Sequence, residues 1–179
     1  MVVTLDLSVR TKGHTDITDI TSQVSAAVRE SGLQAGIVTV FCPGSTGGLS
    51  TIEYEGGVMS DLRQVLDEVV PPDRDYRHHL RWGDDNGSAH VRSALIGPSL
   101  TVPFVDGNLT LGTWQQIVFL DFDTRARSRP LNHHGHRISM VCGLNLDLHQ
   151  STRACRLVHA GSHICFNSCT NSVCPAPAV

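Results

Sequence analysis

Residues 76–90 read YRHHLRWGDDNGSAH and concentrate side chains that can do chemistry. His79 and His90 stand on either side of a loop that contains Asp85. Two imidazoles and a carboxylate held together in this way can bind a metal ion or relay a proton. The spacing is not a metal-site signature of its own, unlike a Cys-x2-Cys pair. A structural alternative, in which the loop only caps a helix and the histidines fill the surface or core, stays open.

A second polar stretch, PGSTGGLSTIEYE, covers residues 43–55. Its glycines allow close backbone approach, and Ser45, Thr46 and the backbone amides can cradle a phosphate or another anion. It is not a P-loop, because no Gly-Lys-Ser/Thr sequence ends it. An ordinary β-turn explains the same glycines, so that alternative also stays open. Glu53 and Glu55 follow a short expected strand, a place where carboxylates are more often solvated than catalytic.

The third stretch, LGTWQQI at residues 111–117, places Trp114 and Gln115 at the start of an expected strand. A Trp with a neighbouring Gln can line a pocket or stack on a ring. A core Trp is the structural alternative.

Hydrophobic periodicity predicts the elements that must position these side chains. Strands are predicted at residues 2–9, 36–42, 49–52, 100–105, 109–111 and 114–122, and helices at residues 20–31, 58–69 and 89–97. We expect Asp19 or Thr21 to cap the first helix, and a residue between Asp84 and Ser88 to cap the last. This order predicts an α+β fold: a single-domain layered sandwich with a mainly antiparallel sheet and helices packed on one side of it.

Composition excludes several classes of protein. The 179-residue chain carries a net charge of −3, so no basic field across the sequence points to nucleic acid. No apolar run approaches the roughly 18 residues that span a bilayer. The N-terminus alternates and carries an early acidic residue, unlike a signal peptide. We therefore expect a cytoplasmic protein that binds neither nucleic acid nor membrane.

Residues 132–179 differ in composition from residues 1–131. They contain no Glu and no Lys, but they hold six of the ten histidines and five of the six cysteines. Short apolar islands appear there without a sustained period. The sequence predicts an α+β domain over residues 1–131, followed by an atypical Cys/His-rich tail that is poorly ordered.

The three polar stretches, taken in chain order, resemble those of the YjbQ-type family, which is also described as secondary thiamine-phosphate synthase. The resemblance covers about residues 1–129 and includes PGSTGGLSTIEYE, DYRHHLRWGDDNGSAHVRSALIG and LTLGTWQQIVFLDFD. It implies an α+β domain that assembles as a homotrimer, with polar residues lining clefts near subunit interfaces. It also implies an enzyme that joins a pyrimidine diphosphate to a thiazole phosphate and releases pyrophosphate. A homotrimer that binds a metal or a phosphorylated ligand without turnover is the alternative.

The resemblance also implies roles for individual residues. Its recurring polar positions fall on Thr46, Glu53, His79, Asp85, His90, Trp114 and Gln115. We expect Ser45 and Thr46 to hold a phosphate, and Trp114 and Gln115 to contact a ring. His79 and His90 are expected to act as acid–base or metal-binding groups oriented by Asp85 and Asn86, with Glu53 as a further catalytic candidate. A divalent cation, Mg²⁺ or Zn²⁺, would offset the charge that develops on pyrophosphate.

The chain departs from the family pattern at two places. Many members carry His-Thr-Ser/Thr-Ala where this chain has Gly44-Ser45-Thr46-Gly47, so a three-histidine site would lack one ligand unless His78 substitutes. Members also end with an apolar strand after the Arg-rich segment, whereas unrelated sequence begins here at Pro130. We hypothesise that translation continues in a shifted frame and that the last sheet strand is missing or replaced.

Overall fold

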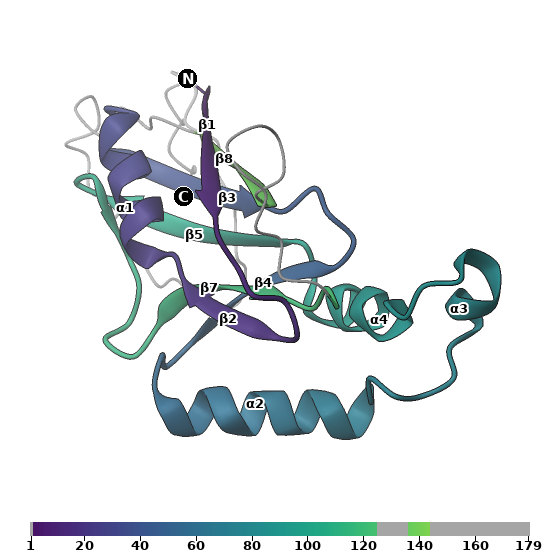
Figure 1. Ribbon diagram of the computed structural model, residues 1–179. Coiled ribbons are helices and arrows are strands. Elements are labelled where there is room, and N and C mark those ends of the chain that lie inside the picture. Colours follow the sequence, from purple (N-terminus) through teal and green to yellow (C-terminus); the bar gives the residue numbers. More distant parts are fainter. Residues whose placement is uncertain (1, 125–135, 144–179) are drawn as a thin grey trace, which may run out of the picture. The chain divides into compact units, whose positions relative to one another are not determined.

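The computed structural model describes residues 2–124 and 136–143, the latter as backbone. In chain order the elements are β1 (Val2–Val9), β2 (Asp16–Asp19), α1 (Thr21–Glu30), β3 (Ala35–Phe41), β4 (Gly47–Ile52), α2 (Gly56–Val69), α3 (Arg77–Trp82), α4 (Gly87–Ile96), β5 (Ser99–Val105), β6 (Asn108–Leu109), β7 (Gln116–Asp121) and β8 (His136–Gly143). Figure 1 shows their arrangement. The chain divides into two units, Met1–Leu146 and Asp147–Val179, and the second lies outside the described residues.

The strands form two antiparallel sheets rather than the single sheet expected. The larger sheet has the order β1-β8-β3-β5-β6, and the smaller has the order β2-β7-β4. Every pairing between neighbouring strands is antiparallel. The predicted α+β class is therefore confirmed. The division into two sheets depends on pairing between distant strands, which local periodicity does not report.

The main core lies between the two sheets and α1. Val24 and Val28 of α1 are fully buried there, together with Val38 and Val40 of β3 and Phe119 of β7. These residues share one face of α1 and alternate along β3, as an amphipathic helix and a half-buried strand require. The predicted helix and strand are thus present for the expected reason.

A second core lies on the other face of the smaller sheet, where α2 and α4 cover it (Figure 1). Val118 and Leu120 of β7 pack there with Leu66 of α2 and Ala89 of α4. Because successive residues of β7 face opposite cores, this strand reads as a continuous apolar run. The smaller sheet is therefore the middle layer, with helices beyond it and the larger sheet behind it.

Three elements were not predicted: β2, α3 and β8, the last of which is described below. β2 pairs with β7 through Asp16–Asp19, a segment for which the sequence predicts no strand. The N-cap of α1 is Ile20, whose side chain cannot cap. Asp19 Oδ1 instead accepts from Thr21 N at 2.8 Å and from Thr21 Oγ1 at 2.6 Å. With four residues in β2 and six in α3, neither element is long enough to show a hydrophobic period in the sequence.

β8 lies in the segment that we predicted to be an atypical tail. It pairs with both β1 and β3, so a strand occupies a central position of the larger sheet. Backbone hydrogen bonds carry this pairing, which explains how a segment without a sustained pattern forms a strand. The sequence pattern did not predict this strand. Residues 144–179 of the predicted tail lie outside the described residues.

Arg92 of α4 is a buried charged residue, 5% exposed. Its Nε and Nη2 donate to the carbonyl oxygen of Val70 at 3.0 and 2.6 Å, and Nη1 donates to Thr15 Oγ1 at 2.7 Å. Nη2 also lies 2.7 Å from Asp67 Oδ1. One guanidinium therefore fastens α4 to the end of α2 and to the β1–β2 loop.

Replacing Arg92 with Met should lower the free energy of unfolding by about 3 kcal/mol, because buried acceptors lose charged donors. Urea unfolding measures the change. Asp67→Asn is the matched control, since that carboxylate side chain is 58% exposed and its loss should cost less than about 1 kcal/mol. Equal losses in the two variants would contradict a buried anchor.

Glu55 is the N-cap of α2. Its carboxylate accepts hydrogen bonds from the backbone amides of Val58 and Gly57, as a capping side chain does. These two hydrogen bonds, that from Val58 first, hold the pKa of Glu55 below its ordinary value of 4.5, against a smaller opposing effect of desolvation. A lowered pKa in the folded state means that this cap stabilises the fold above the ordinary value. The stabilisation is lost as the pH falls through the folded-state pKa.

Glu55→Gln should therefore lower the melting temperature near neutral pH, and its difference from the wild type should shrink below pH 4.5. Circular dichroism melts across this range measure it. Glu53→Gln, which removes a neighbouring exposed carboxylate outside the cap, is the control. A similar pH-dependent loss in the control would assign the effect to net charge.

Candidate functional site

The candidate site is built where α4 lies against β4. Ser93 Oγ donates to the carbonyl oxygen of Gly47 at 2.7 Å in a buried contact. A Cβ at Gly48 would lie 2.7 Å from Ile96 Cγ2, and a Cβ at Gly47 would lie 2.7 Å from the Phe119 ring. Both distances are too short for a residue with a Cβ unless a neighbour moves. These two glycines therefore serve the packing of α4 and of β7.

His90, in the first turn of α4, contacts the Gly-rich loop. Its Nδ1 lies 3.1 Å from the carbonyl oxygen of Ser45. Since a carbonyl can only accept, Nδ1 carries the hydrogen. In the neutral ring Nε2 then holds the lone pair that can accept a proton or bind a metal ion.

His78 packs against His90, with ring centroids 4.5 Å apart and ring planes inclined by 49°. Its Nε2 lies 3.4 Å from Asp84 Oδ1, without the geometry of a hydrogen bond. We call His78 and His90 the histidine pair. Ser45 Oγ belongs to an exposed residue beside it, so the pair and the loop present polar groups at one surface.

His79, which we expected in the site, is engaged elsewhere. Its Nε2 accepts a hydrogen bond from the backbone N–H of Gly87 at 3.3 Å. Its ring also meets the edge of Tyr76 at 5.7 Å between centroids. The lone pair that would bind a metal is thus already used, and His78 takes the place beside His90.

The N-cap of α4 falls within the expected stretch, residues 84–88, but the expected side-chain hydrogen bond is not made. Asn86 occupies the N-cap but makes no capping hydrogen bond through its side chain. Asp84 faces His78 instead. Asp85 is exposed and lines an open polar hollow of about 440 Å³, whose lining is Pro72, Asp73, Arg74, Asp75, His79 and Asp85.

The remaining expected site residues do not gather at the histidine pair. Thr46 is buried, with its Oγ1 at 3.5 Å from Asp123 Oδ2, so its hydroxyl faces the interior. Trp114 is 69% exposed, and Gln115 Oε1 accepts from Gly112 N at 2.9 Å. Glu53 is exposed just after β4.

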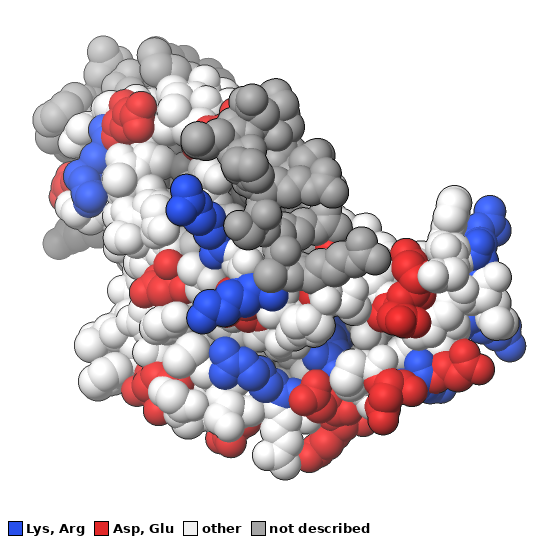
Figure 2. Space-filling model, viewed as in Figure 1, with Lys and Arg blue, Asp and Glu red and all other residues white. Residues whose placement is uncertain are grey.

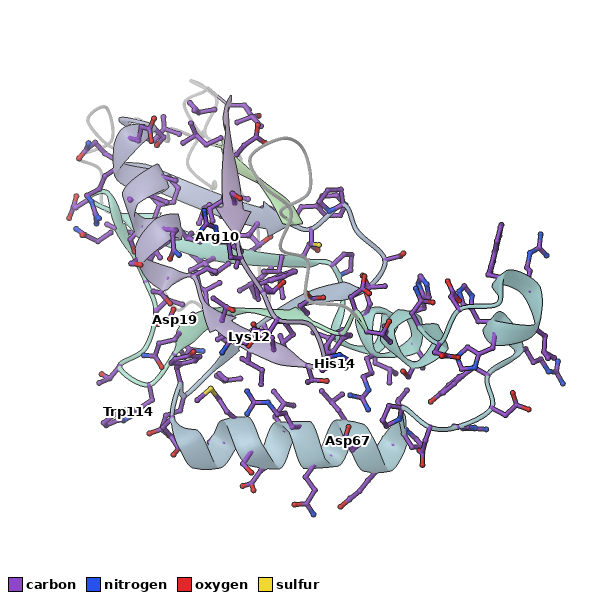
Figure 3. The ribbon with its side chains drawn as sticks, in the orientation of Figure 1. Arg10, Lys12, His14, Asp19, Asp67 and Trp114 are labelled. Atoms are coloured by element: carbon purple, nitrogen blue, oxygen red, sulfur yellow. The ribbon has the colours of Figure 1, made fainter. Side chains whose placement is uncertain are left out.

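The register of the smaller sheet explains this separation. Gly47 pairs with Asp121, whereas Ile52 pairs with Gln116. Ser45 therefore lies before one end of β4, and Glu53, Trp114 and Gln115 lie at the other end. The two ends of the strand, Gly47 and Ile52, are roughly 17 Å apart. Figure 3 shows Trp114 and His14 at opposite ends of this sheet. The expected residues form two groups within one chain.

A loop that we did not single out joins the Ser45 end. Asp16 pairs with Asp121, so the β1–β2 loop meets the same sheet end as Gly47. Its residues Gly13, His14 and Thr15 all have positive φ, at 72°, 54° and 61°. Such backbone strain costs energy at non-glycine residues and persists only where contacts hold it, here from Arg92. The exposed His14 had no sequence signal beyond the glycine before it.

Charge and metal-binding groups are distributed as follows. Figure 2 shows both signs of charge interspersed on the viewed face. Across residues 2–124 and 136–143, no three His, Cys, Asp or Glu side chains are grouped to hold a metal ion. No helix in the described part of the chain is long and apolar enough to cross a bilayer.

Comparison with known proteins identifies the relatives of this fold and site. The family model described as UPF0047 protein YjbQ-like matches residues 5–136. The chain belongs to the YjbQ-like (UPF0047) family. A UPF0047 protein of Methanothermobacter thermautotrophicus is 39% identical over 122 residues, which cover 68% of this chain and 84% of that protein. YugU of Bacillus subtilis is 34% identical over 118 residues, covering 65% and 87%.

Solved YjbQ-like structures agree with this fold. A YjbQ-like protein of unknown function from Sulfolobus solfataricus superposes with a TM-score of 0.71 at 30% identity and covers 79% of this chain and 96% of its own. A YjbQ/UPF0047 protein from Clostridium acetobutylicum gives 0.66 at 32% identity, covering 77% and 98%. The resemblance seen in the sequence is therefore confirmed at the level of family and fold.

The contact between α4 and β4 can be tested at Gly48. Gly48→Ala should push Ile96 and α4 away from β4 and lower the free energy of unfolding by about 1–3 kcal/mol. Urea unfolding measures this change. Gly56→Ala is the matched control, since a Cβ there meets nothing within 4 Å. Equal effects at the two glycines would exclude close packing as the reason for Gly48.

Proposed function

We propose that this chain is an enzyme of the secondary thiamine-phosphate synthase type. A bond forms between the pyrimidine methylene carbon and the thiazole nitrogen as the bond from that carbon to the diphosphate oxygen breaks. Pyrophosphate leaves with the electron pair. Membership of the YjbQ-like family supports the proposal. The observation that carries it is the histidine pair beside the exposed Ser45.

The residues of the histidine pair suit a reaction in which negative charge develops on a leaving phosphate. Because Nδ1 of His90 is held by the Ser45 carbonyl, Nε2 is the atom that can give or take a proton at a phosphate oxygen. His78 contacts it through a tilted ring–ring contact, and its own Nε2 approaches Asp84. Ser45 would hold a phosphate oxygen through its hydroxyl, while the buried Thr46 supports the loop.

A homotrimer that binds a metal ion or a phosphorylated ligand without turnover is the second candidate. One observation favours it: Trp114, Gln115 and Glu53 lie at the far end of β4 from His90. Within one chain the two groups do not meet, so a site that uses both would need a neighbouring copy. A divalent metal, Mg²⁺ or Zn²⁺, does not find a complete ligand set in the described part of one chain. It would need donors from a second copy in addition to His90 Nε2.

Pyrophosphate release from the two thiamine precursors tests the first proposal. His90→Ala and His78→Ala should each lower the rate by about 100-fold or more, the range for loss of a group that transfers protons. Arg29→Ala, which changes an exposed residue of α1, is the control and should keep the wild-type rate. Equal release by wild type and His90→Ala would exclude a catalytic His90.

Elemental analysis and light scattering distinguish the second candidate, the non-catalytic trimer, from the enzyme. A trimer that retains metal or phosphate without releasing pyrophosphate would support it. Release of pyrophosphate by metal-free protein would support the enzyme instead.

A further inference from the structure

The first turn of α4 depends on a side chain from outside the helix. The first N–H groups of a helix have no partner within it, and the N-cap side chain usually accepts from one of them. Asn86 does not do so. His79 Nε2 accepts from the N–H of Gly87, the first residue of α4, at 3.3 Å. His79, eight residues before Gly87, thus provides the capping acceptor that Asn86 does not.

The backbone around His79 holds this ring in place. His79 N donates to the carbonyl oxygen of Tyr76 at 3.0 Å, and its own carbonyl accepts from Gly83 N at 2.9 Å. Gly83 ends α3 with φ of 66°, the left-handed conformation that glycine adopts easily. Tyr76 Oη in turn donates to the carbonyl oxygen of Pro71 at 2.8 Å. Both ends of α3 therefore fix His79 relative to the end of α2.

The same contact requires glycine at position 87. A Cβ at this position would lie 2.6 Å from Tyr76 Cβ and 3.1 Å from His79 Nε2. Only glycine lets the start of α4 approach α3 closely enough for the hydrogen bond to form. The cap therefore needs both residues: His79 as the acceptor and Gly87 as the residue without a Cβ.

The same turn of α4 carries His90. Its backbone N–H donates to the carbonyl oxygen of Asn86 at 3.2 Å, which places it within the segment that His79 caps. We propose that His79 is a positioning residue: its neutral imidazole caps α4 and thereby holds His90 Nδ1 on the Ser45 carbonyl. The inference rests on the proposed role of His90 in the site. It assigns His79 a part different from that of a metal ligand or a catalytic acid.

A histidine cap depends on the proton, whereas an amide cap does not. When Nε2 is protonated it becomes a donor and faces the Gly87 N–H, and a positive charge then stands at a helix N-terminus. The groups around the ring are Tyr76 at its edge, Asp73, Arg74 and Asp75 from the segment after α2, and Asp85 from the segment before α4. Arg77 and Arg81 lie on α3 itself.

Imidazole NMR of the full-length protein tests the proposal without any variant. Long-range ¹H–¹⁵N spectra should show neutral His79 with its proton on Nδ1 and a lone pair on Nε2. Finding the proton of neutral His79 on Nε2 would overturn the proposal.

Two variants extend the test. In His79→Gln an amide oxygen near the position of Nε2 can accept from Gly87, while in His79→Ala nothing can. Exchange of the Gly87 amide should speed up roughly fivefold in His79→Ala, the effect of losing a helix cap, and should recover in His79→Gln.

The nitrogen shifts of His90 report its position independently of turnover. We expect them to change in His79→Ala and to return to wild-type values in His79→Gln. Unchanged Gly87 exchange and unchanged His90 shifts in His79→Ala would overturn the proposal. If wild-type protein releases no pyrophosphate but these signals behave as expected, the proposed reaction fails while the positioning role of His79 stands.

Discussion

The close contact between α4 and β4 is the constraint on which the candidate site depends. Ser93 Oγ on the Gly47 carbonyl, and Ile96 over the bare Cα of Gly48, hold the helix against the strand. At this separation His90 reaches the Ser45 carbonyl. A side chain at Gly48 would meet Ile96 and push α4 away from β4, whereas one at Gly47 would meet the Phe119 ring. The position of His90 therefore depends on the packing around Gly48.

Arg92 extends this constraint to segments that are distant in sequence. One guanidinium joins α4 to Val70 at the end of α2 and to Thr15 in the β1–β2 loop. That loop holds three successive residues at positive φ, and the guanidinium is one of the contacts that keep it there. The Ser45 end of the smaller sheet thus gathers a strained loop, a glycine-rich loop and the start of a helix. Active sites in proteins are often assembled from such segments.

The neighbouring histidines of α3 divide two tasks by the groups they meet. His78 faces His90 and the Asp84 carboxylate, which suits proton chemistry at the surface. His79 meets a backbone N–H, which suits a structural acceptor. Adjacent positions on α3 therefore give identical side chains different roles, because one meets the Asp84 carboxylate and the other meets the Gly87 N–H. Glu53, Trp114 and Gln115 stand outside this arrangement, at the other end of β4.

The sequence by itself determined the α+β class, most helices and strands, and the family, because periodicity and long motifs are local properties of the chain. The apolar face of α1 and the alternation in β3 were readable for this reason. Only the tertiary structure decided that β7 separates two cores, that β8 enters the larger sheet, and that His79 caps α4 while His78 meets His90. Each of these depends on a partner distant in sequence or on the direction of a side chain around one short turn. The spacing of residues in the sequence reports neither the distant partner nor the direction of the side chain.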